Sequence, residues 1–211
     1  MKRVIVISAV LVALIVSSTR ADSIPGLFNT GVNSDNTRLP SGVLEQHYIL
    51  TGMSSTAYVS QGIPGIWAEP ATDAMWIAPS NGETDVPQGE YAYKLTFDLS
   101  GFDPATATIS GAWASDNGST IYLNGMSTQF NIGPGAYRFL TGFTIVGGFL
   151  PNINTLEFHV TNSLYYDPLY HGGGNPSGLL VQSLSGSAQP VPEPATILLL
   201  GLGGLVLSKR K

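Results

Sequence analysis

The residues of this chain that could carry catalysis are few and far apart. Its three histidines, His47, His159 and His171, have no histidine partner two or four positions away, and the sequence contains no cysteine. Thiol catalysis, iron–sulfur clusters and cysteine-bound zinc are therefore excluded. No Gly-x-Ser-x-Gly, Ser-x-x-Lys or His-Glu-x-x-His motif occurs. The sequence predicts a protein that is not an enzyme, and the alternative is a hydrolase whose carboxylates meet only in the folded chain.

Carboxylates are spread along the chain and form no motif. No Asp-x-Asp-x-Asp-Gly run is present, so a calcium loop of the EF-hand type is not predicted. Loops between strands often offer carboxylates and carbonyls to a structural calcium ion, and the candidate ligands are Asp35, Asp103 and Asp116. The simpler interpretation is that all three are solvated loop acids. No other cofactor is predicted.

Aromatic rings presented to solvent beside polar groups could bind a sugar. Trp67 lies in a loop rich in Pro and Gly, and a later loop combines tyrosines with an acid and a histidine. The candidate sugar-binding residues are Trp67, Tyr165, Tyr166, Tyr170 and His171. Trp76 and Trp113 sit in alternating segments and are predicted to fill the core, and core or edge packing is favoured over a ligand platform for Trp67 as well.

The charge of the chain excludes one class of partner. Between residues 22 and 190, three Lys or Arg residues oppose thirteen Asp or Glu residues. Such a surface has no basic stripe to neutralise phosphates, so nucleic-acid binding is not expected. The acidity suits solubility in a crowded anionic exterior, where extracellular polysaccharide is a candidate partner.

The C-terminal segment carries the most specific pattern in the sequence. Pro192, Glu193 and Pro194 come first, an apolar stretch fills residues 195–207, and Lys209, Arg210 and Lys211 end the chain. The prolines favour an extended segment. The apolar stretch suits a lipid-facing helix, although it is short for a span, and the basic end marks the cytoplasmic side. An ordinary C-terminal core helix is the alternative, but it leaves the Pro-Glu-Pro run and the basic end unexplained.

This arrangement resembles the tail of the PEP-CTERM proteins, which is a sorting signal recognised by an exosortase. The resemblance implies that the export machinery and an exosortase are partners. It also implies a protein held transiently at the inner membrane by a short transmembrane anchor. Processing near Pro192, Glu193 and Pro194 would then deliver it to the cell surface or the extracellular matrix.

The N-terminal segment has the layout of a secretory signal peptide over residues 1–21. Lys2 and Arg3 are followed by an apolar stretch over residues 4–16 and a small, polar exit that ends at Ala21. We expect cleavage after Ala21. An uncleaved anchor is the alternative, but thirteen apolar residues rise only about 20 Å as a helix, short of a hydrocarbon core of about 30 Å.

The segment between these ends predicts an all-β domain over residues 22–187, with residues 188–211 forming a linker and the sorting signal. Apolar residues alternate with polar ones, and Gly, Pro and Asn turns recur at about ten-residue spacing, which is typical of an antiparallel β-sandwich or jelly roll. Asp116-Asn117-Gly118 is predicted to be a hairpin turn. A second turn is expected at Asn124-Gly125. The strands are expected at residues 47–51, 56–60, 75–78, 91–99, 106–114, 119–123, 139–146, 154–162 and 177–185. Their predicted core residues are Leu95, Phe97, Trp113, Ile121, Leu156, Phe158 and Val160.

The central strands also resemble β-sandwiches of the galactose-binding-like type. The resemblance rests on Ala112-Trp113-Ala-Ser-Asp-Asn-Gly, on Asn154-Thr-Leu-Glu-Phe-His-Val-Thr-Asn162 and on Gly178-Leu-Leu-Val, in that order. It implies the fold and suggests a carbohydrate ligand. The leading hypothesis is an exported protein with a structural or adhesive role in exopolysaccharide or biofilm. A carbohydrate-binding module with a defined sugar site is the alternative.

Overall fold

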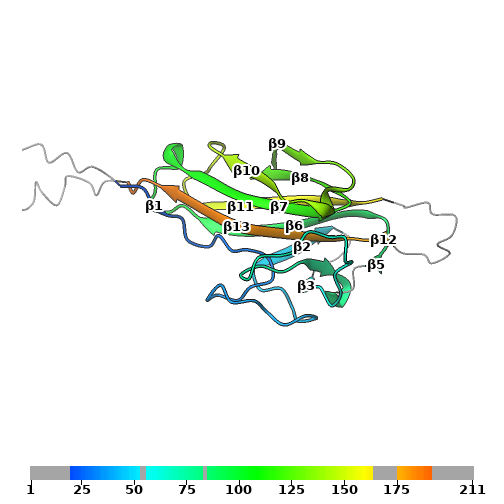
Figure 1. Ribbon diagram of the computed structural model, residues 1–211. Coiled ribbons are helices and arrows are strands. Elements are labelled where there is room, and N and C mark those ends of the chain that lie inside the picture. The colour runs from blue at the N-terminus through cyan, green and yellow to red at the C-terminus, as the bar shows by residue number, and fades with distance from the viewer. Residues whose placement is uncertain (1–19, 53–55, 83–84, 164–174, 192–211) are drawn as a thin grey trace, which may run out of the picture.

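The computed structural model describes residues 20–52, 56–82, 85–163 and 175–191, and these residues form an all-β fold (Figure 1). They contain thirteen strands and three single-turn 3-10 helices, with no α-helix in the described ranges. No helix among these residues has the length and apolarity needed to cross a membrane. The N-terminal residues 1–19 and the C-terminal residues 192–211 lie outside the described part of the chain.

Two antiparallel sheets face each other. The first has the strand order β10-β7-β13-β4-β3, with β1 also paired to β13, and the second has the order β2-β6-β11-β8-β9. A third, two-stranded sheet joins β12 to β5. The strands are β1 (Asp22–Ser23), β2 (Tyr48–Gly52), β3 (Ala57–Val59), β4 (Ile77–Pro79), β5 (Asp85–Val86), β6 (Gly89–Asp98), β7 (Thr108–Asp116), β8 (Gly118–Leu123), β9 (Met126–Ile132), β10 (Thr141–Ile145), β11 (Ile153–Asn162), β12 (Asn175–Pro176) and β13 (Gly178–Ala188). The 3-10 helices are η1 (Ser80–Gly82), η2 (Pro104–Thr106) and η3 (Ala136–Arg138).

Alternation along the strands explains how the two sheets bury a common core. In β11, the residues at every second position are buried while their neighbours are partly or fully exposed, as expected of a strand with one face in a core. The predicted core is confirmed, because each of its members is at most 2% exposed: Leu95, Phe97, Trp113, Ile121, Leu156, Phe158 and Val160. The prediction of an all-β antiparallel fold is also confirmed.

Aromatic side chains join the two sheets across this core. Phe143 of β10 packs edge-on against Trp113 of β7, with ring centroids 5.5 Å apart. The same ring meets Phe158 of the opposite sheet at 6.1 Å. Such edge-to-face contacts contribute about 0.5–1.5 kcal/mol each beyond the buried area. The sequence contains no cysteine, so packing of this kind and not a disulfide joins the two sheets.

The predicted hairpin at Asp116-Asn117-Gly118 is wrong. Strands β7 and β8 are not paired there, because β7 belongs to the first sheet and β8 to the second. The chain crosses between the sheets at this point, and neither Asn117 nor Gly118 has the positive φ of a primed turn. Glycine is needed for space, since a Cβ atom on Gly118 would lie 2.7 Å from the carbonyl oxygen of Ile132.

The primed-type hairpin lies at the next Asn-Gly pair instead. Asn124 and Gly125 have φ values of 52° and 77°, and they connect β8 to β9, which pair as antiparallel neighbours. Residues 124–125 were expected to turn, but β9 itself was not predicted. Its sequence is mostly polar and its side chains are partly or fully exposed, so the burial signal that identifies the other strands is absent.

The segment between β1 and β2 was also not predicted to join the sheet. Thr30 donates its backbone N–H to Val181 O at 3.0 Å, and its hydroxyl accepts from Val181 N at 3.0 Å. The side-chain oxygen of Asn29 accepts from Leu184 N at 2.9 Å. These bonds fall where β13 shifts register against β7, between Gln182 and Ser185. The N-terminal segment therefore lies along the other edge of the irregular part of β13.

The close approach at Gly118 gives a direct test of the crossover. Replacing Gly118 with Ala should reduce the free energy of unfolding by about 1–3 kcal/mol, because the added methyl group meets backbone that cannot move aside. Gly133→Ala is the matched control: a Cβ there has no neighbour within 4 Å, and the change should stay within about 0.5 kcal/mol. Urea unfolding of residues 22–191 measures both, and equal midpoints would contradict the crossover geometry.

Candidate functional site

At the end of the sandwich where the described chain ends, hydrogen bonds hold the last residues to the domain. After β13, Gln189 O accepts from Asp103 N at 2.8 Å, Pro190 forms a bridge with Phe102, and Val191 N donates to Gly101 O at 2.8 Å. The linker expected from residue 188 onward is therefore hydrogen-bonded to the domain through Val191. The sorting residues Pro192, Glu193 and Pro194 and the basic end, Lys209, Arg210 and Lys211, lie outside the described residues.

The N-terminus of the folded domain lies at the same end. Asp22 pairs with Ala188 and Ser23 with Ser187, and both termini of the coloured ribbon meet at the left of Figure 1. Cleavage after Ala21 would leave Asp22 as the first residue, already within β1. We call this region the anchor end; it comprises the chain exit at residues 188–191, the loops 99–107, 124–125 and 146–152, and the strand ends next to them, including β1.

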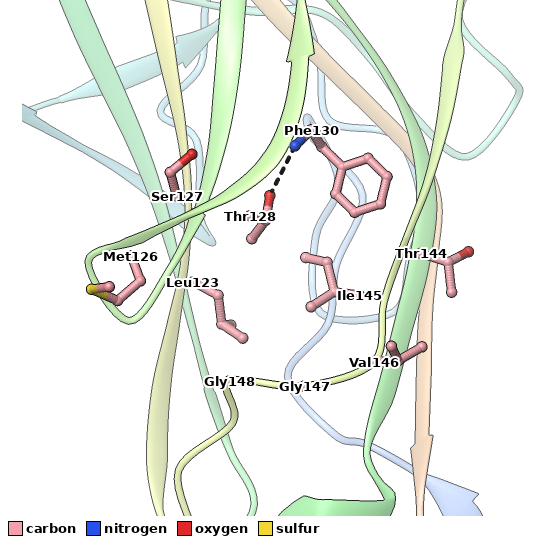
Figure 2. Close-up of a pocket in the computed structure, with 10 residues that line it drawn as sticks. All are labelled: Leu123, Met126, Ser127, Thr128, Phe130, Thr144, Ile145, Val146, Gly147 and Gly148. Atoms are coloured by element: carbon pink, nitrogen blue, oxygen red, sulfur yellow. Dashed lines mark hydrogen bonds between the residues drawn. The ribbon is translucent and has the colours of Figure 1, made fainter.

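A shallow groove opens beside the anchor end, between the edge strands β9 and β10 (Figure 2). Its volume is about 280 Å³. Its lining is mainly apolar, with one polar contact between the Phe130 N–H and the Thr128 hydroxyl oxygen at 3.4 Å. The apolar lining residues are Leu123, Met126, Phe130, Ile145 and Val146. With this lining, the groove offers apolar contact and few hydrogen bonds.

Trp67 does not form the exposed platform that a sugar site would need. It is 6% exposed, and its indole N–H donates to the carboxylate of Asp116 at 3.0 Å. Its ring lies 4.3 Å from that of Trp76. Trp67 therefore belongs to a second core cluster, as the favoured interpretation of this residue expected. Trp76 and Trp113 are buried as predicted.

The remaining candidate sugar-binding residues, Tyr165, Tyr166, Tyr170 and His171, lie outside the described residues. The chain on either side of them is tightly held. The Asn175 side-chain amide donates to Asn117 Oδ1 at 3.0 Å, to Asn162 Oδ1 at 2.9 Å and to Ser163 O at 2.8 Å. Asn162 donates in turn to Val86 O at 2.9 Å. This asparagine network joins Ser163 to Asn175, the residues on either side of that segment. It lies at the end of β11 opposite the anchor end.

The three candidate calcium ligands do not converge. Asp35 is exposed, and Asp103 caps η2 by accepting from Ala105 N at 3.0 Å. Asp116 is buried beneath Trp67. The described part of the chain holds no cluster of three or more acidic or histidine side chains arranged to bind a metal ion.

Asp116 is a buried acid with an incomplete set of partners. One carboxylate oxygen accepts from Trp67, and the other has no hydrogen-bond partner. Burial raises the pKa of Asp116 to about 6, while the Trp67 bond acts in the opposite direction. A buried carboxylate whose charge is poorly compensated favours its protonated form. Asp116 was expected to be a solvated loop acid, but burial raises its pKa well above that of such an acid.

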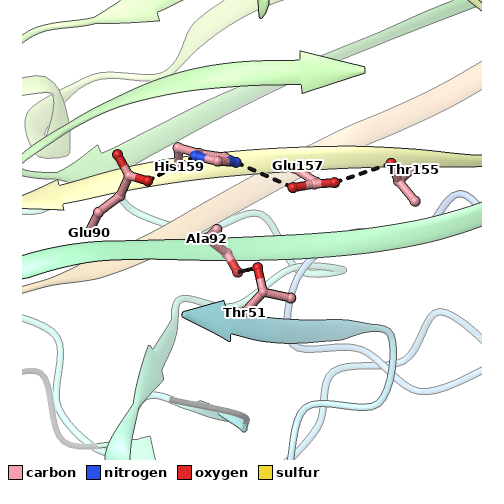
Figure 3. A network of polar contacts seen from close by, with 6 residues as sticks. All are labelled: Thr51, Glu90, Ala92, Thr155, Glu157 and His159. Carbon is pink, nitrogen blue, oxygen red and sulfur yellow. Dashed lines mark hydrogen bonds and ion pairs between the residues drawn. The ribbon is translucent and has the colours of Figure 1, made fainter. Parts of the chain in front are cut away.

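A polar network on the outer face of the second sheet was not predicted as a unit (Figure 3). The His159 ring lies between two carboxylates, 3.0 Å from Glu90 and 3.3 Å from Glu157. It also packs on Tyr122, with ring centroids 4.3 Å apart. The alternation in residues 154–162 places His159 and Glu157 on the solvent side. Glu90 and Tyr122 come from the neighbouring strands β6 and β8, so their approach depends on strand register.

The pKa of Asp116 generates a prediction about pH and stability. In the unfolded chain Asp116 loses its proton near its ordinary pKa of about 3.9, and in the fold near 6. The folded state binds more protons between these values, so the free energy of unfolding should fall as pH rises from 4 to 6 and stay lower above that. Asp116→Asn should remove about 2–3 kcal/mol of this fall, whereas the exposed control Asp35→Asn should follow the parent. Thermal unfolding from pH 4 to 8 measures the difference, and an unchanged slope in Asp116→Asn would disprove the assignment.

The comparisons with known proteins identify the C-terminal segment. The PEP-CTERM protein-sorting motif matches residues 190–211. No curated protein matches the chain. Among solved structures, a GH31 alpha-xylosidase from Xanthomonas citri is similar at 9% sequence identity, over 78% of this chain and 25% of that chain, with a TM-score of 0.20. This chain thus spans a quarter of the length of that enzyme.

The matched motif and the folded domain overlap, because Pro190 and Val191 belong to both. The motif implies export through a membrane-anchored intermediate and processing by an exosortase. The chain therefore consists of an antiparallel β-sandwich joined directly, without a free linker, to a PEP-CTERM protein-sorting motif.

Proposed function

We propose that this chain is a non-enzymatic structural or adhesive protein of the bacterial surface or extracellular matrix, where it is embedded in exopolysaccharide. The observation that carries the proposal is the sorting motif at residues 190–211, which continues directly from the last hydrogen-bonded residues of the sandwich. A signal peptide over residues 1–21 starts export, and the tail holds the protein at the inner membrane. Processing at the Pro-Glu-Pro run then releases the domain outside.

The properties of the domain suit an extracellular structural role. Its two sheets are joined by aromatic packing, with no cysteine that could be oxidised or reduced. Its excess of acidic residues disfavours nonspecific attachment to anionic surfaces and supports solubility among charged polymers. Because packing and not disulfides joins the sheets, the fold does not depend on the redox conditions outside the cell.

A second candidate function is carbohydrate binding at a defined site. The observation that favours it is the outer-face network, where the Tyr122 ring lies beside the polar groups of His159, Glu157 and Glu90. An aromatic ring next to hydrogen-bonding groups is the combination that sugars require. The resemblance of residues 90–187 to galactose-binding-like sandwiches supports the same idea. Tyr165, Tyr166, Tyr170 and His171 remain candidates at the opposite end of β11.

Sorting is tested by replacing Pro192, Glu193 and Pro194 with alanines. We expect the variant to accumulate as a full-length, cell-associated protein, because the recognition run is lost while the apolar stretch and the basic end still retain it in the membrane. The parent should appear as a shorter, surface or extracellular form. A blot of fractionated cells from a host with an exosortase measures both.

Two controls complete the sorting experiment. Pro134→Ala changes an exposed proline of the sandwich and should be processed like the parent. In a host without exosortase, the parent itself should stay full length. If the parent and the triple-alanine variant have the same size and location in the competent host, the tail is only an anchor and the proposed route is wrong.

The sugar site is tested by co-sedimentation of residues 22–191 with purified exopolysaccharide. If the outer-face network binds sugar, Tyr122→Ala should weaken binding roughly fivefold to tenfold, the effect of losing about 1–1.4 kcal/mol of ring contact. Tyr58→Ala, a half-buried tyrosine of the other sheet, should bind like the parent. Unchanged binding of the Tyr122 variant would exclude this site and leave a distributed, adhesive contact.

A further inference from the structure

The exposed apolar side chains of the described residues are concentrated at the anchor end. Ten large apolar side chains are exposed in the described chain, and five of them lie on the exit and its adjacent loops and strand ends. We call these five the anchor-end surface: Met126, Val146, Leu150, Ile153 and Val191, which are 74%, 71%, 49%, 56% and 54% exposed. The apolar groove of Figure 2 opens beside them, because Met126 and Val146 line it.

Hydrogen bonds hold the loops of this surface in fixed positions. Asn154 is fully buried, and its side chain accepts from Leu150 N at 2.8 Å and donates to Leu150 O at 2.9 Å. Asn124 donates to Gly148 O at 3.0 Å, which joins the β8–β9 turn to the same loop. Leu99 N donates to Asn152 O at 3.0 Å, which joins the loop to the turn that holds Val191. The apolar side chains are therefore displayed on a rigid platform.

The length of chain between this platform and the apolar tail decides what the platform meets. Val191 is bonded to the sandwich, and the apolar stretch begins at Ala195. Four Cα–Cα steps reach at most about 14 Å. The polar layer of one leaflet is about 5–8 Å thick. While the tail is in the membrane, the anchor end is thus held within or next to the lipid headgroups.

The charge of the anchor end indicates which kind of contact forms there. Apart from Arg20, which the expected cleavage after Ala21 removes, its charged side chains in the described residues include Asp22, Asp98 and Asp103. The last two accept backbone N–H groups at Ser100 and Ala105. Anionic headgroups would not attract such a surface. Apolar side chains that enter the lipid–water interface give the attraction instead. The membrane-anchored tail keeps the domain at a high local concentration beside the bilayer, so even a weak contact is populated.

From these observations we propose that, before processing, the sandwich stands end-on against the bilayer, with the anchor-end surface in contact with the lipid interface. The contact fixes the height and orientation of the Pro-Glu-Pro run relative to the membrane. It is lost when the tail is removed. The proposal rests on the membrane-anchored intermediate that the sorting motif implies and is independent of any adhesive or sugar-binding role.

Depth-dependent quenching of the full-length chain in phosphatidylcholine vesicles tests the proposal. The chain has no cysteine, so single labels are unambiguous: Leu150→Cys and Ile153→Cys report on the anchor end, and Leu200→Cys reports on insertion of the tail. Ile66→Cys is the matched control, 61% exposed and next to Trp67 at the opposite end of the sandwich. We expect headgroup-level nitroxide lipids to quench an environment-sensitive dye at positions 150 and 153 at least twofold more than at position 66.

Each other outcome overturns the proposal in a distinguishable way. If position 200 is quenched while 150 and 153 behave like 66, the tail anchors a domain that does not touch the membrane. If position 200 is not quenched, the membrane-anchored premise fails. A blue shift of the dye emission at position 150 that rises with the protein-to-lipid ratio but shows no lipid quenching would assign the surface to a second copy of the chain.

A charged variant of the surface gives a further check. Met126→Asp combined with Ile153→Cys should reduce the quenching at position 153, and near-ultraviolet circular dichroism verifies that each variant is folded.

Discussion

The fold depends on the position of β13, the last strand, in the interior of the first sheet. Along one edge it pairs with β7 from Gly178 to Ser187. Along the other it meets β4, the Asn29–Thr30 segment and β1 in succession. A strand bonded on both edges cannot separate from the sheet without breaking two hydrogen-bond ladders. Each backbone N–H or C=O group that is left unpaired in the interior costs free energy. The C-terminus is therefore locked to the body, and the sorting motif has to begin where β13 and its last bonds end.

This constraint also links the two ends of the chain. The bonds between residues 22–30 and 181–188 join segments more than 150 positions apart. Contacts of such sequence separation form late, because the closure of a long loop has to precede them. We therefore expect the sandwich to be complete only after its last strand has been exported, just as the apolar tail reaches the membrane. Completion of the fold and arrival of the sorting signal are thus coupled by topology.

The sequence predicted those features of the fold that depend on neighbouring residues, and it missed those that depend on contacts between distant segments. Alternation in residues 91–99 and 154–162 identified two central strands and the buried face of each. A strand buried on one face needs apolar residues at every second position, and the sequence shows that pattern directly. The crossover at Gly118 was missed because its glycine avoids a clash with Ile132 O, a contact between distant strands. Residues 185–190 were divided between strand and linker because they are small and polar. In the fold, small residues are required there, since a Cβ on Gly186 would lie 2.7 Å from Leu27 and 2.9 Å from Thr108 O. The Pro/Gly loop left Trp67 open as a sugar-site candidate beside the favoured packing role, because its partner Asp116 is 49 positions away.

The sandwich separates the anchor end from the asparagine network along the strand direction. Strand β11 runs from Ile153 at the anchor end to Asn162 in the asparagine network, and its ten residues span about 30 Å. The network that holds Ser163 and Asn175 bonds to Asn117, Val86 and Pro87 and uses no group of the anchor end. The exit at Val191 in turn bonds to Gly101 and uses no group of the network. Because no hydrogen bond joins the two regions among the described residues, changes in the segment after Ser163 should leave the presentation of the sorting motif the same.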